Sequence, residues 1–278
     1  MEAGFKFTKL VFYPILLLLT FVSTLTFLPA RGQVKKQGKT NVLREDGKQP
    51  HDLDTSLLTK IKFKNIGPTV MNGRVVDIDV NPADNTEFYV AYASGGLWHT
   101  VNNGQSFVPA FDKEKVITIG DIAVNWHTGT IWVGTGEANS SRSSYAGNGV
   151  YKSSDTGKTW QYLGLPQSHH IGKIILSKVD NNVAWVAALG HLYTPNKERG
   201  VYKTMDGGNT WTQVLFIDEN TGAIDMDINP LNENELYASM WHRERRAWNF
   251  VESDPTSAIY KSLDAGKTWK PVTLNSSG

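Results

Sequence analysis

A short phrase recurs three times along this 278-residue chain and constrains its fold more than any other feature. Each copy begins with Ser or Thr, has Asp two residues later and Gly two residues after that, and closes with Thr-Trp. The copies span residues 153–160, 204–211 and 262–269, and a degenerate copy occupies 100–107. They recur at a period of about fifty residues, which is typical of a propeller or solenoid array.

The residue types of the phrase suit a tight turn between two strands. The Asp carboxylate and the leading hydroxyl can each accept bonds from backbone N–H groups of the turn. The Gly can take a positive φ without strain, and we expect the closing Trp to pack between neighbouring repeat units. The predicted structural residues are Ser153, Asp155, Gly157, Trp160, Thr204, Asp206, Gly208, Trp211, Ser262, Asp264, Gly266 and Trp269.

Apolar, β-branched and aromatic runs predict four strands in each repeat. One run precedes each phrase, one follows it, and two come earlier, the first of these opening after a glycine. Four strands in about fifty residues make a propeller blade. The sequence therefore predicts an all-β β-propeller in residues 61–278. Its four-stranded blades are expected at about 73–112, 120–165, 172–217 and 222–274. Since closed rings of only four blades are rare, we expect these blades to be part of a larger propeller.

The repeated phrase is the Asp-box of the BNR-repeat proteins. From about Lys62 to Val272, the chain resembles the N-terminal part of a sortilin-type β-propeller found in large secreted bacterial, glycosyl hydrolase-like proteins. Two further phrases, at 90–98 and 134–145, resemble that subfamily beyond the box. The box implies a fold and not a function, because the same residues support the turn in sialidases, glycosidases and sorting receptors.

The N-terminus has the pattern of an export signal. Lys6 and Lys9 precede an apolar stretch, and small residues follow it at Ala30 and Gly32. We therefore predict a signal peptide at 1–32 and an exported chain, whether periplasmic, cell-surface or secreted. An uncleaved membrane anchor is the alternative, because the apolar stretch approaches bilayer-spanning length. Residues 33–60 read as a polar lead-in, and the membrane is expected as a partner only through the N-terminal segment.

Composition and motifs exclude several functions. The formal net charge is +1, which argues against nucleic-acid binding through a basic surface. The chain has no cysteine, so disulfides cannot stabilise it. It also lacks a serine-nucleophile elbow and a phosphate-binding loop, and we expect no cofactor.

The loops predict where a ligand binds. Because strands alternate in direction, loops between second and third strands lie on the face opposite the Asp-box turns. These loops lengthen from the first blade to the fourth, and insertions on one face usually mark a binding face. The candidate ligand-binding residues are Glu137, Arg142, His169, His170, His191, Tyr193, Trp241, Arg243, Arg245 and Trp248. For any one of them, a solvated or mutually satisfied polar network is the alternative.

Metal binding and sialidase activity each require specific residues, which can be sought in the sequence. His169 and His170 with His191 could be zinc ligands, but adjacent histidines in an extended segment point apart, and we expect no metal. The Arg-Ile-Pro phrase of sialidases is absent, since Arg74 is followed by Val75.

Other glycosidases need two carboxylates that flank the scissile bond. The possible members are Asp77, Asp121, Glu137, Asp225 and Glu244. The alternation of Asp with apolar residues on the inner strands is also explained by one polar strand face, so no catalytic residue is assigned.

Together these observations predict a noncatalytic exported β-propeller that binds an extracellular protein, peptide or glycan on its long-loop face. Sortilin-type propellers bind peptide and protein segments, so the resemblance favours that ligand class. The alternative is part of a carbohydrate-active glycoside hydrolase, whose catalytic carboxylates would be shared with missing blades or a second propeller.

Overall fold

The computed structural model of the protein describes residues 73–141 and 144–272. The chain divides into two units, Met1–Phe63 and Lys64–Gly278, and every described residue belongs to the second. The predicted signal segment, the lead-in and Arg142 lie outside the described residues. Those described form almost entirely β-structure, and none of their helices is long and apolar enough to cross a membrane.

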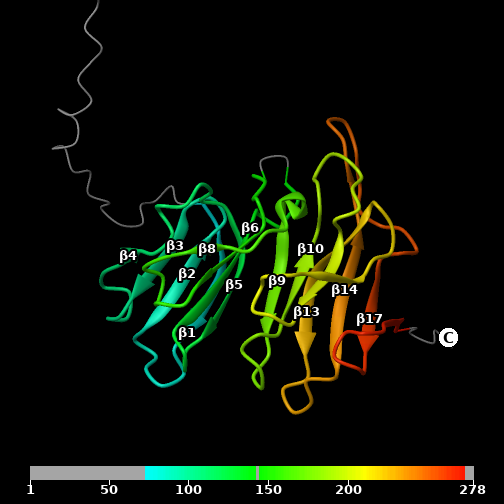
Figure 1. Ribbon diagram of the computed structural model, residues 1–278. Coiled ribbons are helices and arrows are strands. Elements are labelled where there is room, and N and C mark those ends of the chain that lie inside the picture. The colour runs from blue at the N-terminus through cyan, green and yellow to red at the C-terminus, as the bar shows by residue number, and fades with distance from the viewer. Residues whose placement is uncertain (1–72, 142–143, 273–278) are drawn as a thin grey trace, which may run out of the picture. The chain divides into compact units, whose positions relative to one another are not determined.

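The described residues of the second unit form four antiparallel four-stranded sheets, which confirms the predicted fold class (Figure 1). The first sheet contains β1 (Val75–Val80), β2 (Phe88–Tyr92), β3 (Gly96–Thr100) and β4 (Val108–Pro109). The second contains β5 (Ile119–Asn125), β6 (Thr130–Thr135), β7 (Val150–Ser153) and β8 (Gln161–Tyr162). The third contains β9 (Ile171–Leu176), β10 (Ala184–Ala188), β11 (Gly200–Thr204) and β12 (Thr212–Leu215).

The fourth sheet contains β13 (Thr221–Ile228), β14 (Leu236–His242), β17 (Ala258–Ser262) and β18 (Lys270–Pro271). Strands pair in chain order within each sheet, except that a separate hairpin interrupts the fourth. This hairpin pairs β15 (Glu244–Arg245) with β16 (Phe250–Val251). A short 3-10 helix, η2 (Pro166–Ser168), precedes β9.

The first strands of successive sheets pack side by side, β1 against β5, β5 against β9 and β9 against β13 (Figure 1). The glycines that open these strands explain the close approach. A Cβ at Gly120 would clash with the carbonyl oxygen of Ile171, and one at Gly172 with that of Ile224. Small residues at these positions therefore let the inner strands of neighbouring blades touch backbone to backbone.

The apolar core lies between neighbouring sheets in three clusters. One cluster joins the first and second sheets, the next joins the second and third around Trp132, and the last joins the third and fourth around Trp185. Both tryptophans are only 1 % exposed. Since burying an apolar side chain contributes roughly 1.5–3 kcal/mol, packing between blades is a main source of stability.

The Asp-box turns have the hydrogen bonds that their residue types favour. The Ser153 hydroxyl donates to Asp155 Oδ1 (2.7 Å) and accepts from the N–H of Gly157 (2.8 Å). Asp155 Oδ1 also accepts from the N–H of Thr159 (2.9 Å), and Gly157 has φ +82°. The indole of Trp160 donates to the carbonyl of Ala110 in the preceding sheet (2.7 Å). Each box thus closes its own turn and ties its blade to its neighbour.

Trp211 makes the same link, donating to the carbonyl of Leu163 in the preceding sheet (2.8 Å). Trp269 differs, because its indole donates to Gly266 within its own turn (3.1 Å). There the third sheet supplies the link instead, since the Trp185 indole and the Lys203 ammonium donate to the carbonyl of Ala265 (3.2 and 2.8 Å).

Carboxylates on the inner strands form a second link between blades. Asp77 accepts from the N–H of Ile122 (3.4 Å), Asp79 from that of Val124 (2.9 Å) and Asp121 from that of Ile174 (2.7 Å). Each bond runs from one blade to the first strand of the next. The polar strand face predicted from the sequence therefore serves, in the first two blades, to bind the neighbouring blade.

Candidate functional site

Two small pockets lie side by side among the long loops, on either side of the segment Leu192–Thr194. The first, of about 190 Å³, we call the histidine pocket. Its lining residues are Ser144, Ala146, His169, His170, His191, Leu192, Tyr193 and Thr194. The second, of about 160 Å³, we call the arginine pocket. Its lining residues are Leu192, Tyr193, Thr194, Pro195, Arg199, Asn220, Arg243, Glu244, Arg245 and Arg246.

The two pockets bring together six of the ten candidate ligand-binding residues. His169, His170 and His191 line the histidine pocket, Arg243 and Arg245 line the arginine pocket, and Tyr193 lines both. They come from the loop before β9, the loop between β10 and β11, and the loop between β14 and β17. Three stretches of chain, remote in sequence, thus meet at Tyr193.

The histidines are held neutral. The rings of His169 and His191 stack with centroids 3.8 Å apart, and burial lowers the pKa of both. His170 is 1 % exposed, and its Nδ1 donates to the carbonyl of Glu137 (2.8 Å). Burial, with Arg243 nearby, lowers the pKa of His170 to about 3. Within the described ranges, no group of three His, Cys, Asp or Glu side chains is placed to hold a metal ion.

Arg199, which is not one of the ten candidate residues, fixes the loop between the pockets. Its Nη2 donates to the carbonyls of His191 (2.8 Å) and Thr194 (3.2 Å), and its Nη1 donates to that of Asn220 (2.9 Å). It is 1 % exposed, and burial lowers its pKa to about 10, so the guanidinium remains charged near neutral pH. The sequence feature that could have indicated this role is the position of Arg199, a charged residue directly before the glycine that opens β11.

Arg243 is buried beneath the same loops. Its Nη2 donates to the carbonyl of Gly190 (3.0 Å), and its Nη1 donates to the Ser140 hydroxyl. Burial lowers its pKa to about 9. Arg243, a candidate ligand-binding residue, is thus a buried cation whose side chain reaches the loops of the second and third blades.

Three other candidates lie apart from the pockets. Glu137 is buried, and its carboxylate is ion-paired with Arg74. The Trp241 indole donates to the carbonyl of Glu252 (2.9 Å) and packs edge-on against Phe250. Trp248 is 81 % exposed at the turn of the β15–β16 hairpin.

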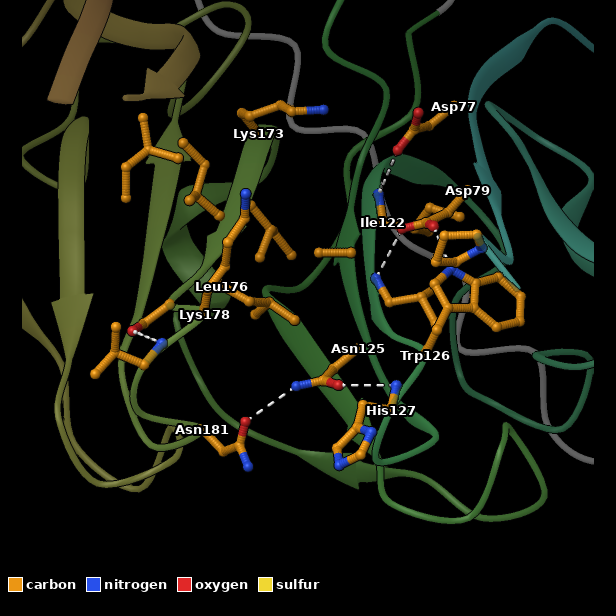
Figure 2. Close-up of a pocket in the computed structure, with 18 of the residues that line it drawn as sticks. Asp77, Asp79, Ile122, Asn125, Trp126, His127, Lys173, Leu176, Lys178 and Asn181 are labelled. Carbon is orange, nitrogen blue, oxygen red and sulfur yellow. Dashed lines mark hydrogen bonds between the residues drawn. The ribbon is translucent and has the colours of Figure 1, made fainter. Parts of the chain in front are cut away.

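A larger cavity, of about 820 Å³, lies along the inner strands and was not predicted (Figure 2). Asp77, Asp79, Trp126, Lys173 and Leu176 are among its lining residues. Its polar groups are mostly engaged, since Asp79 also accepts from the Trp126 indole (2.6 Å) and Lys173 pairs with Asp121 (3.0 Å). Burial raises the pKa of Asp79. This cavity is bounded by blade-joining contacts, unlike the pockets among the long loops.

Comparisons with known proteins agree with this architecture. Residues 148–277 match the family model described as "Sortilin, neurotensin receptor 3". A search of curated proteins gives no match. Among solved structures, an ancestral GH74 enzyme is 21% identical with a TM-score of 0.57. The match covers 76% of this chain and 27% of that enzyme.

Two further structures are similar to the same extent. The GH74 enzyme of Niastella koreensis is 21% identical, with a TM-score of 0.53 over 72% of this chain and 29% of that one. The GH74 xyloglucanase of Xanthomonas campestris is 16% identical, with a TM-score of 0.52 over 73% and 30%. The chain thus spans less than a third of these structures, and identities this low show a shared fold alone. The chain thus has the fold of a β-propeller, and residues 148–277 are similar to the sortilin family.

Proposed function

We propose that this chain is an exported, noncatalytic binding propeller that holds an extracellular protein, peptide or glycan on its long-loop face. One observation carries the proposal, namely the pair of pockets that loops from the second, third and fourth blades form around Tyr193. Long loops positioned by a rigid scaffold are a common way to build a binding surface. Here the buried guanidiniums of Arg199 and Arg243 tie those loops together.

The carboxylates near the pockets favour binding over hydrolysis. Glycosidases generally need two carboxyl groups that flank the bond they cleave. Of the residues lining the two pockets, Glu244 is the only carboxylate, and it pairs with Arg246 (2.6 Å). Glu137 is ion-paired and Asp121 is bonded to Lys173 and Ile174. Hydrolysis at these pockets would require a second carboxylate from a residue that does not line them.

The binding proposal is tested with the Tyr193→Ala variant. The full secreted chain would be screened against peptide and glycan arrays, and the affinity for each hit measured by calorimetry. The variant should weaken binding about tenfold or more, because an aromatic side chain shared by two pockets contributes over 1.4 kcal/mol. Tyr162→Ala is the matched control, since Tyr162 is also exposed but lies on the outer strand β8. Unchanged affinity in Tyr193→Ala would remove the long-loop face as the binding site.

The same preparation tests the two remaining points. Hydrolysis of any bound glycan, lost in Glu244→Gln, would establish the glycosidase alternative. The intact mass of the chain recovered from the medium and the cell envelope tests export. A mass lower by residues 1–32 indicates a cleaved signal, and an unchanged mass in the envelope fraction indicates an anchor.

A further inference from the structure

The arginine pocket carries an excess of positive charge. Four arginines line it, and only Glu244 opposes them there. Glu244 forms ion pairs with Arg246 (2.6 Å) and faces His242 (3.6 Å). Among the described residues, the other three arginines have no ion pair with a carboxylate. Buried charges in proteins are normally paired, so arginines that lack a carboxylate in direct contact need an explanation.

Two of these guanidinium groups also have a nitrogen that donates no hydrogen bond to the described part of the chain. The Nε atoms of Arg243 and Arg245 are buried, and neither has a hydrogen-bond partner within the described part of the chain. Arg243 is fully buried, and its two other nitrogens already bond to Ser140 and Gly190. Arg245 packs its guanidinium over the ring of Phe250 (4.6 Å). An unmet charged donor destabilises a fold, and an oxyanion in the pocket would offset that cost.

We propose that the arginine pocket binds the carboxylate of an acidic saccharide, a uronate unit within a longer glycan. The inference rests on the proposed binding function and specifies its ligand. Guanidinium groups present a planar fork of donors that matches a carboxylate, and such charge-assisted bonds are among the strongest in proteins.

The walls of the pocket favour a sugar ring over the acidic side chain of a peptide. Leu192, Tyr193 and Pro195 line this pocket together with the four arginines, so its lining has an apolar part and a cationic part. A uronate ring has the same division, with a carboxylate at one edge and C–H groups across its face. An acidic peptide side chain is slender and would leave the Tyr193 ring, which is 56 % exposed, uncovered.

The neighbouring pocket extends this argument to a chain of sugars. The histidine pocket shares Leu192, Tyr193 and Thr194 with the arginine pocket, so one ligand can pass over Tyr193 and occupy both. Its histidines are neutral because of burial, which suits the hydroxyl groups of an adjacent, uncharged part of the ligand. A short segment of glycan across Tyr193 thus meets cationic groups on one side and neutral imidazoles on the other.

Calorimetry with three ligands of equal length tests the proposal: an oligogalacturonate, a neutral cello-oligosaccharide and an oligoglutamate peptide. We expect the oligogalacturonate to bind, and its affinity to fall as salt is raised. Arg245→Gln should weaken it about 10- to 100-fold, as expected for one charge-assisted hydrogen-bonded contact. Lys158→Gln removes an equal charge from an exposed Asp-box turn and should leave the affinity unchanged.

Other outcomes separate this proposal from the general one. Preferred binding of the peptide, or of the neutral sugar with no effect of Arg245→Gln, overturns the uronate assignment but retains a binding face. Failure of the oligogalacturonate to bind also overturns it. Arg243→Met is the more severe variant, and thermal unfolding of each protein would distinguish lost binding from lost folding.

Discussion

Replacement of Asp121 by Ala should destabilise the protein through the contact between the second and third blades. Asp121 is 3 % exposed; its Oδ2 accepts from the N–H of Ile174 (2.7 Å) and its Oδ1 from the ammonium of Lys173 (3.0 Å). The variant leaves the Ile174 N–H buried and unbonded, which costs about 1–3 kcal/mol. The Lys173 side chain is one-third exposed, so loss of that pair adds at most about 1 kcal/mol. The expected loss of unfolding free energy is therefore about 1–4 kcal/mol.

A matched control exists in the fourth blade. Asp225 occupies the equivalent strand position, because Asp121 pairs with Gly134 and Asp225 with Ser239 at the same point of the register. Asp225 is exposed, and the hydrogen bond that it accepts comes from the N–H of Met226 in its own strand (2.8 Å). Asp225→Ala should therefore change the unfolding free energy by less than about 0.5 kcal/mol, as is usual for surface positions.

An isosteric variant separates the two bonds. Asp121→Asn keeps an oxygen for the N–H of Ile174 but loses the charge opposite Lys173. Burial raises the pKa of Asp121, so its charged form is costly, and a neutral amide avoids that cost. We expect Asp121→Asn to lose less than half of what Asp121→Ala loses. Urea unfolding followed by tryptophan fluorescence gives all three differences from the midpoints. Equal midpoints for the Ala variants of Asp121 and Asp225 would refute the reasoning.

Three further predictions concern protonation and close packing. The Thr159 hydroxyl holds the pKa of Asp155 at about 2, so the stability from this depressed pKa is present above pH 4 and lost as pH falls from about 4 to 2. Thr159→Val should therefore reduce the fall in urea midpoint over that range, and an unchanged pH profile would contradict this. His170 should stay neutral from pH 8 to 5, because burial lowers its pKa to about 3; an NMR titration of its ring that moved in this range would disprove it. Gly120→Ala should destabilise the protein by roughly 1–3 kcal/mol in urea unfolding, because its Cβ would clash with the carbonyl of Ile171; a wild-type midpoint would show that the strands can separate at little cost.

The parts of the fold that sequence could predict are those determined within a few residues. An Asp-box turn is closed by its own hydroxyl, carboxylate and glycine, as Ser153, Asp155 and Gly157 show. The strands that flank it carry local β-branched and aromatic runs, so their existence follows from composition and period. The short outer strands β8 and β18 directly follow such a turn and pair with the strand before it.

The candidate site was less predictable, because its contacts join residues far apart in the chain. The structure places the three candidate histidines with Arg243 and Arg245 in two neighbouring pockets, but topology could not show which of these side chains are buried. Glu137 is buried because Arg74, from before β1, pairs with it. Arg243 is buried because Ser140 and Gly190 from two other blades accept its donors. Neither partner lies near its residue in sequence, and no local pattern marks either one.

The inner-strand carboxylates also show that local sequence does not determine which side chains are buried. Asp121 and Asp225 stand at one strand position and follow the same alternation with apolar residues, yet one is buried and the other exposed. The difference lies outside both strands. The first strand of the third blade offers the N–H of Ile174 to Asp121, whereas Asp225 bonds to its own strand. The repeat predicts the strand position of a side chain, but contacts with the neighbouring blade determine whether that side chain is buried and what it bonds to. Residues at a boundary between blades can therefore be assigned only together with the strand that faces them.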